Sequence, residues 1–268
     1  MLFLASTGII GDIFNALRGI KFSQLLVGFL FYLASQLIRA LRWWFLLNTR
    51  LDWTISVSFV NVMFNNLLPA RLGELSWFYF AKKAKIELII SFWVFLIARG
   101  FDLLSASVFL LLSIGETFIA VFLLILAFFL ILVIKNFRVS AFRYLNNLSL
   151  KSYMVVFWLS ILSMFLKFLG FIWMFNLWQE LKVVSISFIG SELHSVLPFY
   201  GFAGFGTFEA IFVLPASLRG EEITKWLTIG SAYHIILLLF SIFLGVCGML
   251  YLRRFYISNN ICAITPKN

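Results

Sequence analysis

Hydrophobic residues gather in long segments that shorter polar segments separate. Four of these segments exceed the roughly 20 apolar residues that a helix needs to cross a bilayer. They are residues 22–48, 88–114, 153–178 and 226–251, and a shorter one, residues 117–134, carries no charge. The pattern therefore predicts membrane-spanning helices at these five places.

Two further apolar stretches contain residues that break helices. Residues 54–81 are interrupted by Asn65, Asn66, Pro69, Arg71, Gly73 and Glu74, and residues 191–220 by Pro198, Gly201, Gly204 and Gly206. Proline removes a backbone donor and glycine permits positive φ, so we predict two half-helices joined by unwound backbone in each stretch. Such backbone is tolerated at membrane depth only where it is buried in protein or lines a wet cavity. We expect both stretches to form re-entrant hairpins.

The order of these segments predicts an internal repeat, because each broken stretch follows one long helix and precedes another. Repeat 1 covers about residues 22–114, repeat 2 about residues 153–251, and the span 117–134 links them. The breaks share Leu68-Pro69 with Leu197-Pro198, Gly73 with Gly206, and Glu74 with Glu209. With a re-entrant hairpin in each, the repeats are inverted. The alternative is that residues 54–85 cross the membrane, which would bring the N-terminus inside, and the loop charges barely separate the two topologies. The predicted fold is an all-α, polytopic membrane bundle in which residues 1–268 form a single transmembrane domain.

Composition agrees with a membrane protein and excludes a water-soluble globule. Of 268 residues, 63% are hydrophobic and 12% charged, and 34 Phe and 9 Trp cannot all be buried in a core of this size. The net charge of +10 marks cytoplasmic loops rather than nucleic-acid binding. Basic loops and Arg253 and Arg254 place the C-terminus in the cytoplasm, and we expect a multi-pass protein of the cell (plasma or inner) membrane. Aromatic residues near span ends predict an interfacial belt of Trp43, Trp44, Trp53, Trp77, Trp178, Trp226 and Tyr251.

Ionisable residues occur inside or at the ends of the apolar segments, where each is costly. They are Arg39, Arg42, Arg71, Glu74, Arg99, Asp102, Lys167, Glu192 and Glu209. Arg71 with Glu74 and Arg99 with Asp102 are three residues apart, so each pair can neutralise itself on one helix face. Lys167 is in mid-span and predicts a carboxylate partner.

Arg39 and Arg42 share a helix face with no acidic residue nearby in sequence. We expect them to face a hairpin carboxylate (Glu74, Glu192 or Glu209) or an anionic ligand, because guanidinium binds phosphate or carboxylate in two places. The alternative is that both side chains extend to the headgroups from the end of the first span.

Half-helix N-termini would add to a positive field, with Pro69 near one start and Thr207 as the N-cap of another. His194 and His234 could relay protons, although satisfied interior histidines are more common. The candidate substrate-binding residues are Arg39, Arg42, Asn65, Asn66, Pro69, Arg71, Gly73, Glu74, Arg99, Asp102, Lys167, Glu192, His194, Pro198, Gly204, Gly206 and Glu209. Two cysteines without metal-ligand spacing predict neither a metal nor a cofactor.

Four segments carry a resemblance to a known family: RALRWWFLL (39–47), FNNLLPARLGELSWFYFAKK (64–83), ARGFDLLSASVFLLL (98–112) and VLPFYGFAGFGTFEAIFV (196–213). Together they resemble the lysylphosphatidylglycerol synthase transmembrane family, also described as flippase-like, which includes the membrane domain of the multiple peptide resistance factor. The resemblance implies movement of a lipid between leaflets. Its aminoacyl-transferase domain lies outside the likeness, so synthesis of lysyl-lipid is not implied.

Three functions follow from these observations. The first is a flippase-like protein that moves an anionic or lipid-linked substrate (phospholipid, polyprenyl or hopanoid), with membrane lipids and a separate lipid-modifying or glycosyltransferase enzyme as partners. The second is a membrane-embedded transferase with Glu74, Glu192 or Glu209 as general base, although nucleotide and nucleophile motifs are absent. The third is a scaffold whose charges only hold helices together.

Overall fold

The computed structural model describes residues 8–136, 149–194 and 202–258, and every element within them is helical. In chain order the elements are α2 (Ile9–Gly19), α3 (Phe22–Leu47), α4 (Leu51–Leu67), η1 (Pro69–Arg71), α5 (Glu74–Lys83), α6 (Leu88–Ile114), α7 (Thr117–Asn136), α9 (Leu150–Phe175), η3 (Trp178–Glu180), α10 (Leu181–His194), η4 (Phe202–Gly204), α11 (Thr207–Ser217) and α12 (Ile223–Ser258).

Within the described residues, four helices are long and apolar enough to cross a membrane: α3, α6, α9 and α12. They coincide with the four long predicted segments, so the described part of the chain is all-helical, and its apolar helices indicate a membrane-embedded protein. Helix α6 has the predicted ends, residues 88 and 114, whereas α3 ends one residue earlier than predicted and α9 begins and ends three residues earlier. Helix α12 continues past residue 251 to Ser258, because Arg253 and Arg254 end the apolar run without ending the helix.

Both interrupted stretches are broken as predicted. In the first, α4 ends at Leu67, η1 follows, and Ala70 has a positive φ of 49° before α5 begins at Glu74. A Cβ added to Gly73 would lie 2.2 Å from the Asn65 backbone nitrogen. The side-by-side packing of α5 on α4 therefore requires glycine at this position.

The second break differs in how its helix starts. Ala203 has a φ of 50° and Gly206 a φ of 87°. We expected Thr207 to cap α11, but Gly206 is the cap and Thr207 is the first helical residue. The Gly206 N–H donates to Glu209 Oε2 over 2.7 Å, because a carboxylate three residues on can reach back to the cap. Pro198 and Gly201, predicted helix breakers, lie outside the described residues.

The two halves of the chain share details beyond the order of elements. Helices α3 and α9 each contain 26 residues, and each ends at an asparagine in the left-handed conformation, Asn48 and Asn176. The breaks each place an alanine with positive φ, Ala70 and Ala203, inside a 3-10 turn. One series of long helix, broken pair and long helix therefore occurs twice.

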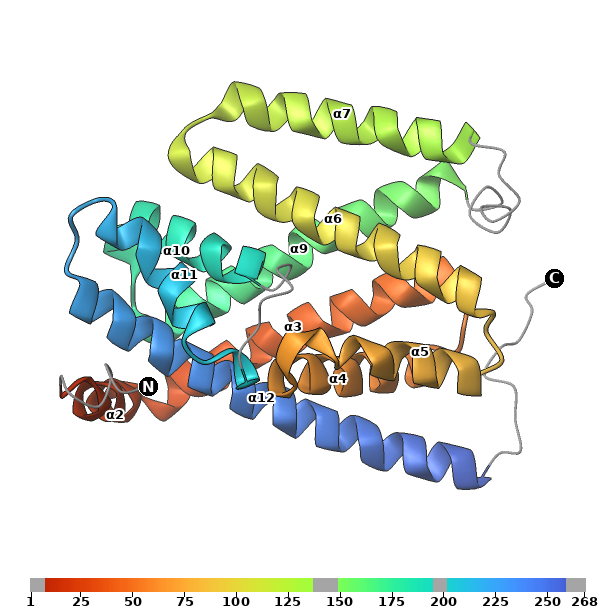
Figure 1. Ribbon diagram of the computed structural model, residues 1–268, viewed down its shortest axis with the longest axis horizontal. Helices are drawn as coiled ribbons and strands as arrows, with labels where there is room; N and C mark the ends of the chain where they lie inside the picture. Colours follow the sequence, from red (N-terminus) through yellow and green to blue (C-terminus); the bar gives the residue numbers. More distant parts are fainter. Residues whose placement is uncertain (1–7, 137–148, 195–201, 259–268) are drawn as a thin grey trace.

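Packing joins the two halves closely. Helix α3 lies along α9, α4 along α12, and α10 against α6, while η1 touches η4. Figure 1 shows α4 and α5 beside the right-hand ends of α3 and α6, whereas α10 and α11 lie beside the left-hand ends of α9 and α12. Helix α7 lies at the outer edge, next to α6 (Figure 1). Each broken pair is thus held at a different end of the long helices.

The predicted aromatic belt is wrong for three of its tryptophans. Trp53, Trp77 and Trp226 are buried, with 0%, 1% and 0% of their surface exposed. Trp77 packs on Trp43 with ring centroids 4.1 Å apart. All three lie near helix ends in sequence, but Trp53 on α4 and Trp77 on α5 pack inside the first broken pair, and Trp226 on α12 packs against Phe212 of α11. Trp178 is 45% exposed, as a belt residue should be.

Candidate functional site

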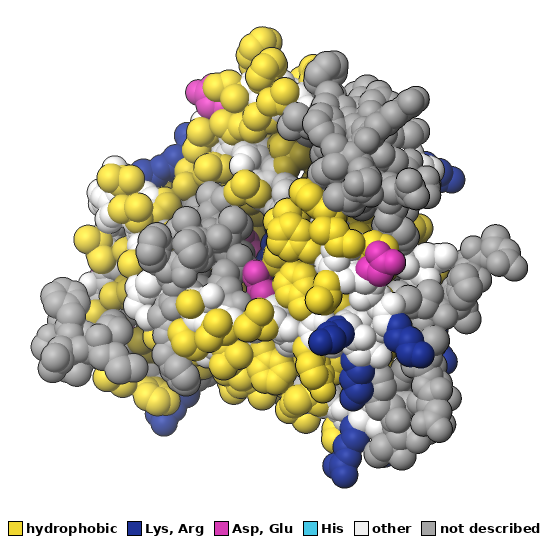
Figure 2. All heavy atoms as spheres, turned by 45° about the vertical axis from the view of Figure 1, so that its right-hand side comes forward, with side chains coloured by type: hydrophobic (Ala, Val, Ile, Leu, Met, Phe, Trp, Pro, Cys, Tyr) yellow, Lys and Arg dark blue, Asp and Glu magenta, His cyan; other side chains and the backbone are white. Residues whose placement is uncertain are grey.

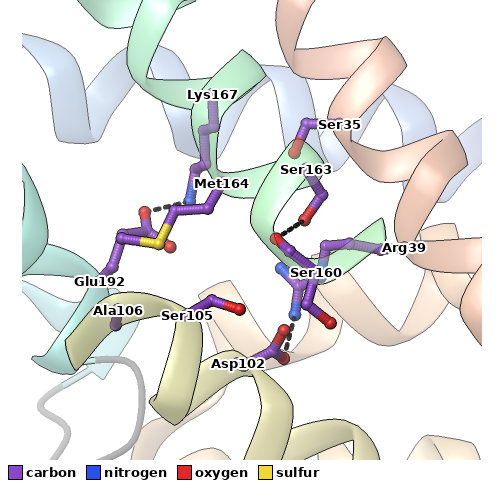
Figure 3. Close-up of a pocket in the computed structure, with 10 residues that line it drawn as sticks. All are labelled: Ser35, Arg39, Asp102, Ser105, Ala106, Ser160, Ser163, Met164, Lys167 and Glu192. Atoms are coloured by element: carbon purple, nitrogen blue, oxygen red, sulfur yellow. Dashed lines mark hydrogen bonds and ion pairs between the residues drawn. The ribbon is translucent and has the colours of Figure 1, made fainter. Parts of the chain in front are cut away.

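A polar cavity lies between helices of the two halves, bordered by α3 and α6 on one side and α9 and α10 on the other. Its lining residues are Ser35, Arg39, Asp102, Ser105, Ala106, Ser160, Ser163, Met164, Lys167 and Glu192 (Figure 3). The cavity has about 40 Å³ for water-sized molecules, which is room for roughly three waters. In Figure 2, acidic and basic side chains are visible inside a hollow that hydrophobic side chains border.

Asp102 on α6 is the centre of charge in this cavity. It accepts hydrogen bonds from Arg42, whose side chain is 1% exposed, and its Oδ2 lies 3.7 Å from Arg39 Nη2. Arg42 also donates to Ser160 Oγ on α9 over 2.6 Å. This corrects two expectations: the arginine pair faces a carboxylate of a long helix rather than of a hairpin, and Arg42 does not extend to the headgroups. Asp102 is 60 residues from Arg42 in sequence, so only tertiary packing brings them together.

Glu74, at the start of α5, accepts a hydrogen bond from Arg99 Nη2 over 2.9 Å. We expected its partner to be Arg71, whose side chain lies outside the described residues. The predicted pair of Arg99 with Asp102 is present at 3.9 Å, a longer distance than that to Glu74. The two acidic and three guanidinium groups therefore form one network that joins the first hairpin to α3 and α6.

Lys167 and Glu192 form the second charged pair of the cavity. Lys167 Nζ lies 2.5 Å from Glu192 Oε1, and the two side chains are 15% and 18% exposed. The prediction that Lys167 has a carboxylate partner is confirmed. Figure 3 shows the pair on the opposite wall of the cavity from Arg39 and Asp102.

Glu209 and His234 meet away from the cavity, where α11 packs on α12. Glu209 Oε1 lies 2.8 Å from His234 Nδ1, and the side chains are 5% and 4% exposed. The Phe208 ring stacks on the imidazole with centroids 4.3 Å apart. Glu74 with Arg99 and Glu209 with His234 each join the first turn of a short helix to the following long helix, and each pair spans 25 residues.

Asn61, which is not among the predicted site residues, stabilises the first break together with the predicted Asn65. Asn61 donates to the Gly73 carbonyl over 3.2 Å, and Asn65 donates to Asn61 Oδ1 over 3.1 Å. Asn65 therefore braces the first break, and Asn66 lies in the last turn of α4. Four serines line the cavity: Ser35, Ser105, Ser160 and Ser163. Small polar residues that recur in apolar helices are typical of helix interfaces in membranes, and that signal could have found them.

The remaining candidates divide by position. Pro69 and Gly73 belong to the first break, and Gly204, Gly206 and Glu209 to the second. The side chains of Arg71 and His194, and the whole of Pro198, lie outside the described residues. Of the selected residues, the cavity lining contains Arg39, Asp102, Lys167 and Glu192.

Charge at the surface is concentrated where the first hairpin meets solvent. Lys82, Lys83 and Lys85 are exposed there, and Lys and Arg side chains gather over part of the face shown in Figure 2. At the start of α4, a hydrogen bond from Arg50 holds the pKa of Asp52 at about 2. Tyr251 of α12 also donates to Asp52 over 2.5 Å, so this surface pair attaches α4 to α12.

Within the described ranges, no three His, Cys, Asp or Glu side chains lie close enough to hold a metal ion. Comparisons of the chain with protein-family models, curated proteins and solved structures found no match. The geometry of the cavity and its charges is therefore the basis for any functional assignment.

Proposed function

We propose that this protein is a flippase-like membrane protein that takes an anionic lipid headgroup into the polar cavity and moves it between leaflets. The cavity carries the proposal. It is polar, it lies between helices long enough to cross a membrane, and its walls come from both halves of the chain. A headgroup could enter such a cavity while its acyl chains stay in lipid.

The charges favour an anion. Three guanidiniums (Arg39, Arg42 and Arg99) face two carboxylates (Asp102 and Glu74), which leaves one positive charge. Arg39 is the residue best placed to use it, because its side chain is 24% exposed and its contact with Asp102 is long, at 3.7 Å. A guanidinium in this setting can bind two oxygens of one phosphate.

Inverted repeats provide a mechanism for alternating access. The helix contacts are consistent with two equivalent repeats, in which α3, α4, α5 and α6 correspond to α9, α10, α11 and α12. Under this correspondence, the contact of α4 with α12 is equivalent to the contact of α10 with α6. The contact of α3 with α9 is equivalent to itself. We infer that the broken pairs are re-entrant hairpins that enter from opposite membrane faces, as their positions in Figure 1 support. Rocking of one repeat against the other would then open the cavity to each leaflet in turn.

The size of the cavity bears on this mechanism. Room for a few waters cannot hold a phospholipid headgroup, so binding requires α3 and α6 to separate from α9 and α10. We interpret the described arrangement as an occluded state, in which the cavity is closed to both leaflets. From the basic loops, we propose that the connection after α5 and the C-terminus lie on the cytoplasmic side of the plasma (or inner) membrane.

From its sequence motifs, we propose that the chain is related to the lysylphosphatidylglycerol synthase transmembrane family. That relationship allows a phospholipid, polyprenyl or hopanoid-linked substrate, supplied by a separate lipid-modifying or glycosyltransferase enzyme. A second candidate function is structural, because Asp102, Glu74, Glu192 and Glu209 all have basic partners. In that case the charges only hold helices together.

Reconstitution in vesicles distinguishes the two functions. The purified protein is placed in vesicles that contain a fluorescent anionic phospholipid, and transfer between leaflets is followed by quenching. We expect Arg39→Gln to slow transfer by about tenfold or more, the cost of one lost charge-assisted contact, and Arg39→Lys to retain part of it. Lys225→Gln, which alters an exposed pair at the start of α12, is the matched control. Equal rates for wild type and Arg39→Gln would refute lipid binding by this cavity.

A further inference from the structure

The two short helices that follow the breaks are joined to the next long helix by pairs that differ in one chemical respect. In the first half, Glu74 is bonded to Arg99, and in the second half Glu209 is bonded to His234. Arginine stays charged at every physiological pH, whereas imidazole gains or loses a proton near neutrality. Equivalent positions thus carry a permanent charge in one half and an exchangeable one in the other.

The surroundings of Glu209 show how a proton would be held. Its Oε2 accepts the Gly206 N–H over 2.7 Å, and its Oε1 faces His234 Nδ1 over 2.8 Å. One hydrogen lies between Oε1 and Nδ1, on one atom or the other, because two acceptors cannot bond to each other, and Nε2 is the second ring atom that can take up a proton. A buried carboxylate is costly unless a positive group compensates it. A proton at Nε2 makes the imidazole cationic and supplies that compensation, while the face of Phe208 stabilises the cation further.

The ionisable groups around this pair come from several helices. On α12 itself they include Lys225, Tyr233, Cys247, Tyr251, Arg253 and Arg254. On the elements packed against α12 they are Glu209 on α11, Asp52 on α4 and the exposed Asp12 and Arg18 on α2, while Glu192 on α10 and Tyr32 on α3 act electrostatically on Tyr233, next to His234. Asp52 is bonded to Tyr251, 17 residues beyond the imidazole along α12. Of these groups, Glu209 is in direct contact with the imidazole. The charge at this place therefore depends on the protonation state of the pair.

The position of the pair connects it to the moving parts of the proposed mechanism. Glu209 is in the first turn of α11, directly after η4, and η4 touches both η1 and α4. Phe205, 40% exposed, covers the imidazole with centroids 5.0 Å apart. A displacement of α11 from α12 would separate Glu209 from His234 and bring the imidazole to water.

We propose that His234 and Glu209 form a proton-binding site, which holds one proton at the imidazole while α11 is packed on α12 and releases it to water when they separate. The site rests on the proposed function for its role, because it would couple proton flow to lipid movement. Proton binding itself is a property of the pair and can be measured without transport.

The first experiment observes the imidazole directly. The chain contains two histidines, His194 and His234, so in a His194→Gln protein that is purified without a histidine tag, the imidazole ¹⁵N NMR signals come from His234 alone. We expect these signals to differ between samples at about pH 5.5 and about pH 8, with more of the cationic form in the acidic sample. Glu209→Gln should lower the cationic share of the acidic sample, because it removes the counter-charge. An imidazole in the same form in both samples, or a cationic share that Glu209→Gln leaves unchanged, would overturn the site.

The second experiment replaces His234 with the residue of the first half. In wild type, and equally in His194→Gln, we expect an unfolding midpoint about 2–4 °C higher at pH 5.5 than at pH 8, the scale of one added ion pair in a chain of this size. The sign follows from the partner: bound protons stabilise the packed pair, so stability is lost as pH rises. His234→Arg should give the same midpoint at both values. If His234→Arg retains the wild-type pH response, the site is refuted.

Transport then separates the two proposals. In vesicles with a pH gradient, wild type should move lipid at rates that differ severalfold between the two gradient directions, and His234→Arg at one rate. Lipid movement with no histidine titration would refute the proton site alone. Histidine titration with no lipid movement at any pH would refute the flippase proposal alone.

Discussion

The two broken hairpins have similar backbones but different chemistry. In the first, Gly73 permits close packing and Glu74 is bonded to Arg99, which belongs to the network that reaches the cavity. In the second, Gly206 supplies a positive φ, and Glu209 is bonded to His234 in a buried site away from the cavity. One backbone design thus supports an arginine pair linked to the cavity in one half and a buried histidine pair away from it in the other.

This difference indicates that backbone shape and site chemistry are separable in this fold. The alanines with positive φ, Ala70 and Ala203, occupy matching places, although the residues that follow them differ. A break needs only a few residues to turn the chain. The side chains next to it can then differ, with Glu74 bonded to Arg99 in one half and Glu209 bonded to His234 in the other.

The largest expected effect comes from removing the carboxylate at the centre of the cavity. Asp102→Asn leaves Arg42, 1% exposed, without its counter-charge, which should cost about 3–5 kcal/mol of stability. Glu192→Gln should cost less, because Lys167 is 15% exposed and borders the cavity. Thermal unfolding in detergent measures both. The double variant Arg42→Met/Asp102→Leu should be more stable than Asp102→Asn, and equal losses for Asp102→Asn and Glu192→Gln would contradict the ranking.

The next effect compares the two hairpin glycines. Gly73→Ala would force Cβ against the backbone of Phe64 and Asn65, and overpacking of this kind costs about 1–3 kcal/mol or more. Gly206→Ala meets no atom within 4 Å, but its φ of 87° is strained for alanine. Midpoints of unfolding should therefore fall for both, and more for Gly73→Ala. A second substitution that shortens Phe64 should not rescue Gly73→Ala, because the clash is with backbone.

A smaller effect tests the buried tryptophans of the two halves. Trp77 and Trp226 are both buried, and their indole Nε1 atoms have no hydrogen-bond partner. Replacement of either by Phe retains most of the apolar contact and removes an unsatisfied donor, so we expect a loss of less than about 1.5 kcal/mol. Alanine at either position should cost about 3–5 kcal/mol. Intrinsic fluorescence during thermal unfolding gives both values, and a large loss for Phe would indicate that the indole N–H has a role.

The smallest effect concerns the surface pairs at opposite ends of the bundle. Asp52→Asn breaks the contact with Arg50, and Lys225→Gln breaks that with Glu180. Each pair is exposed, so we expect changes of about 0.2–1 kcal/mol that shrink in high salt. Because the pKa of Asp52 is lowered to about 2, its stabilising contribution is present above its unfolded pKa of roughly 4 and is lost only as pH falls towards 2. Unfolding of Asp52→Asn should therefore show the wild-type pH response between about pH 5.5 and 8.

Much of the fold was predictable because a helix that crosses a bilayer needs a continuous run of about 20 apolar residues. Apolar length located α3, α6, α9 and α12, and Pro69 and Gly73 located the first break. The partner of Lys167 was predicted as a carboxylate without being identified. Arg42 was misplaced because its partner, Asp102, is on another helix, and pairing across helices leaves no local pattern. The buried Trp77 was assigned to the interface because distance from a helix end does not tell which way a side chain points.

The sequence by itself determined that this chain is helical and membrane-embedded, and where its helices are broken, because these properties depend on local hydrophobicity and on backbone limits of proline and glycine. Tertiary structure alone decided which charges meet. Neutralising a buried charge depends on atoms a few ångströms away in space, and those atoms come from helices that the sequence separates by 25 to 60 residues.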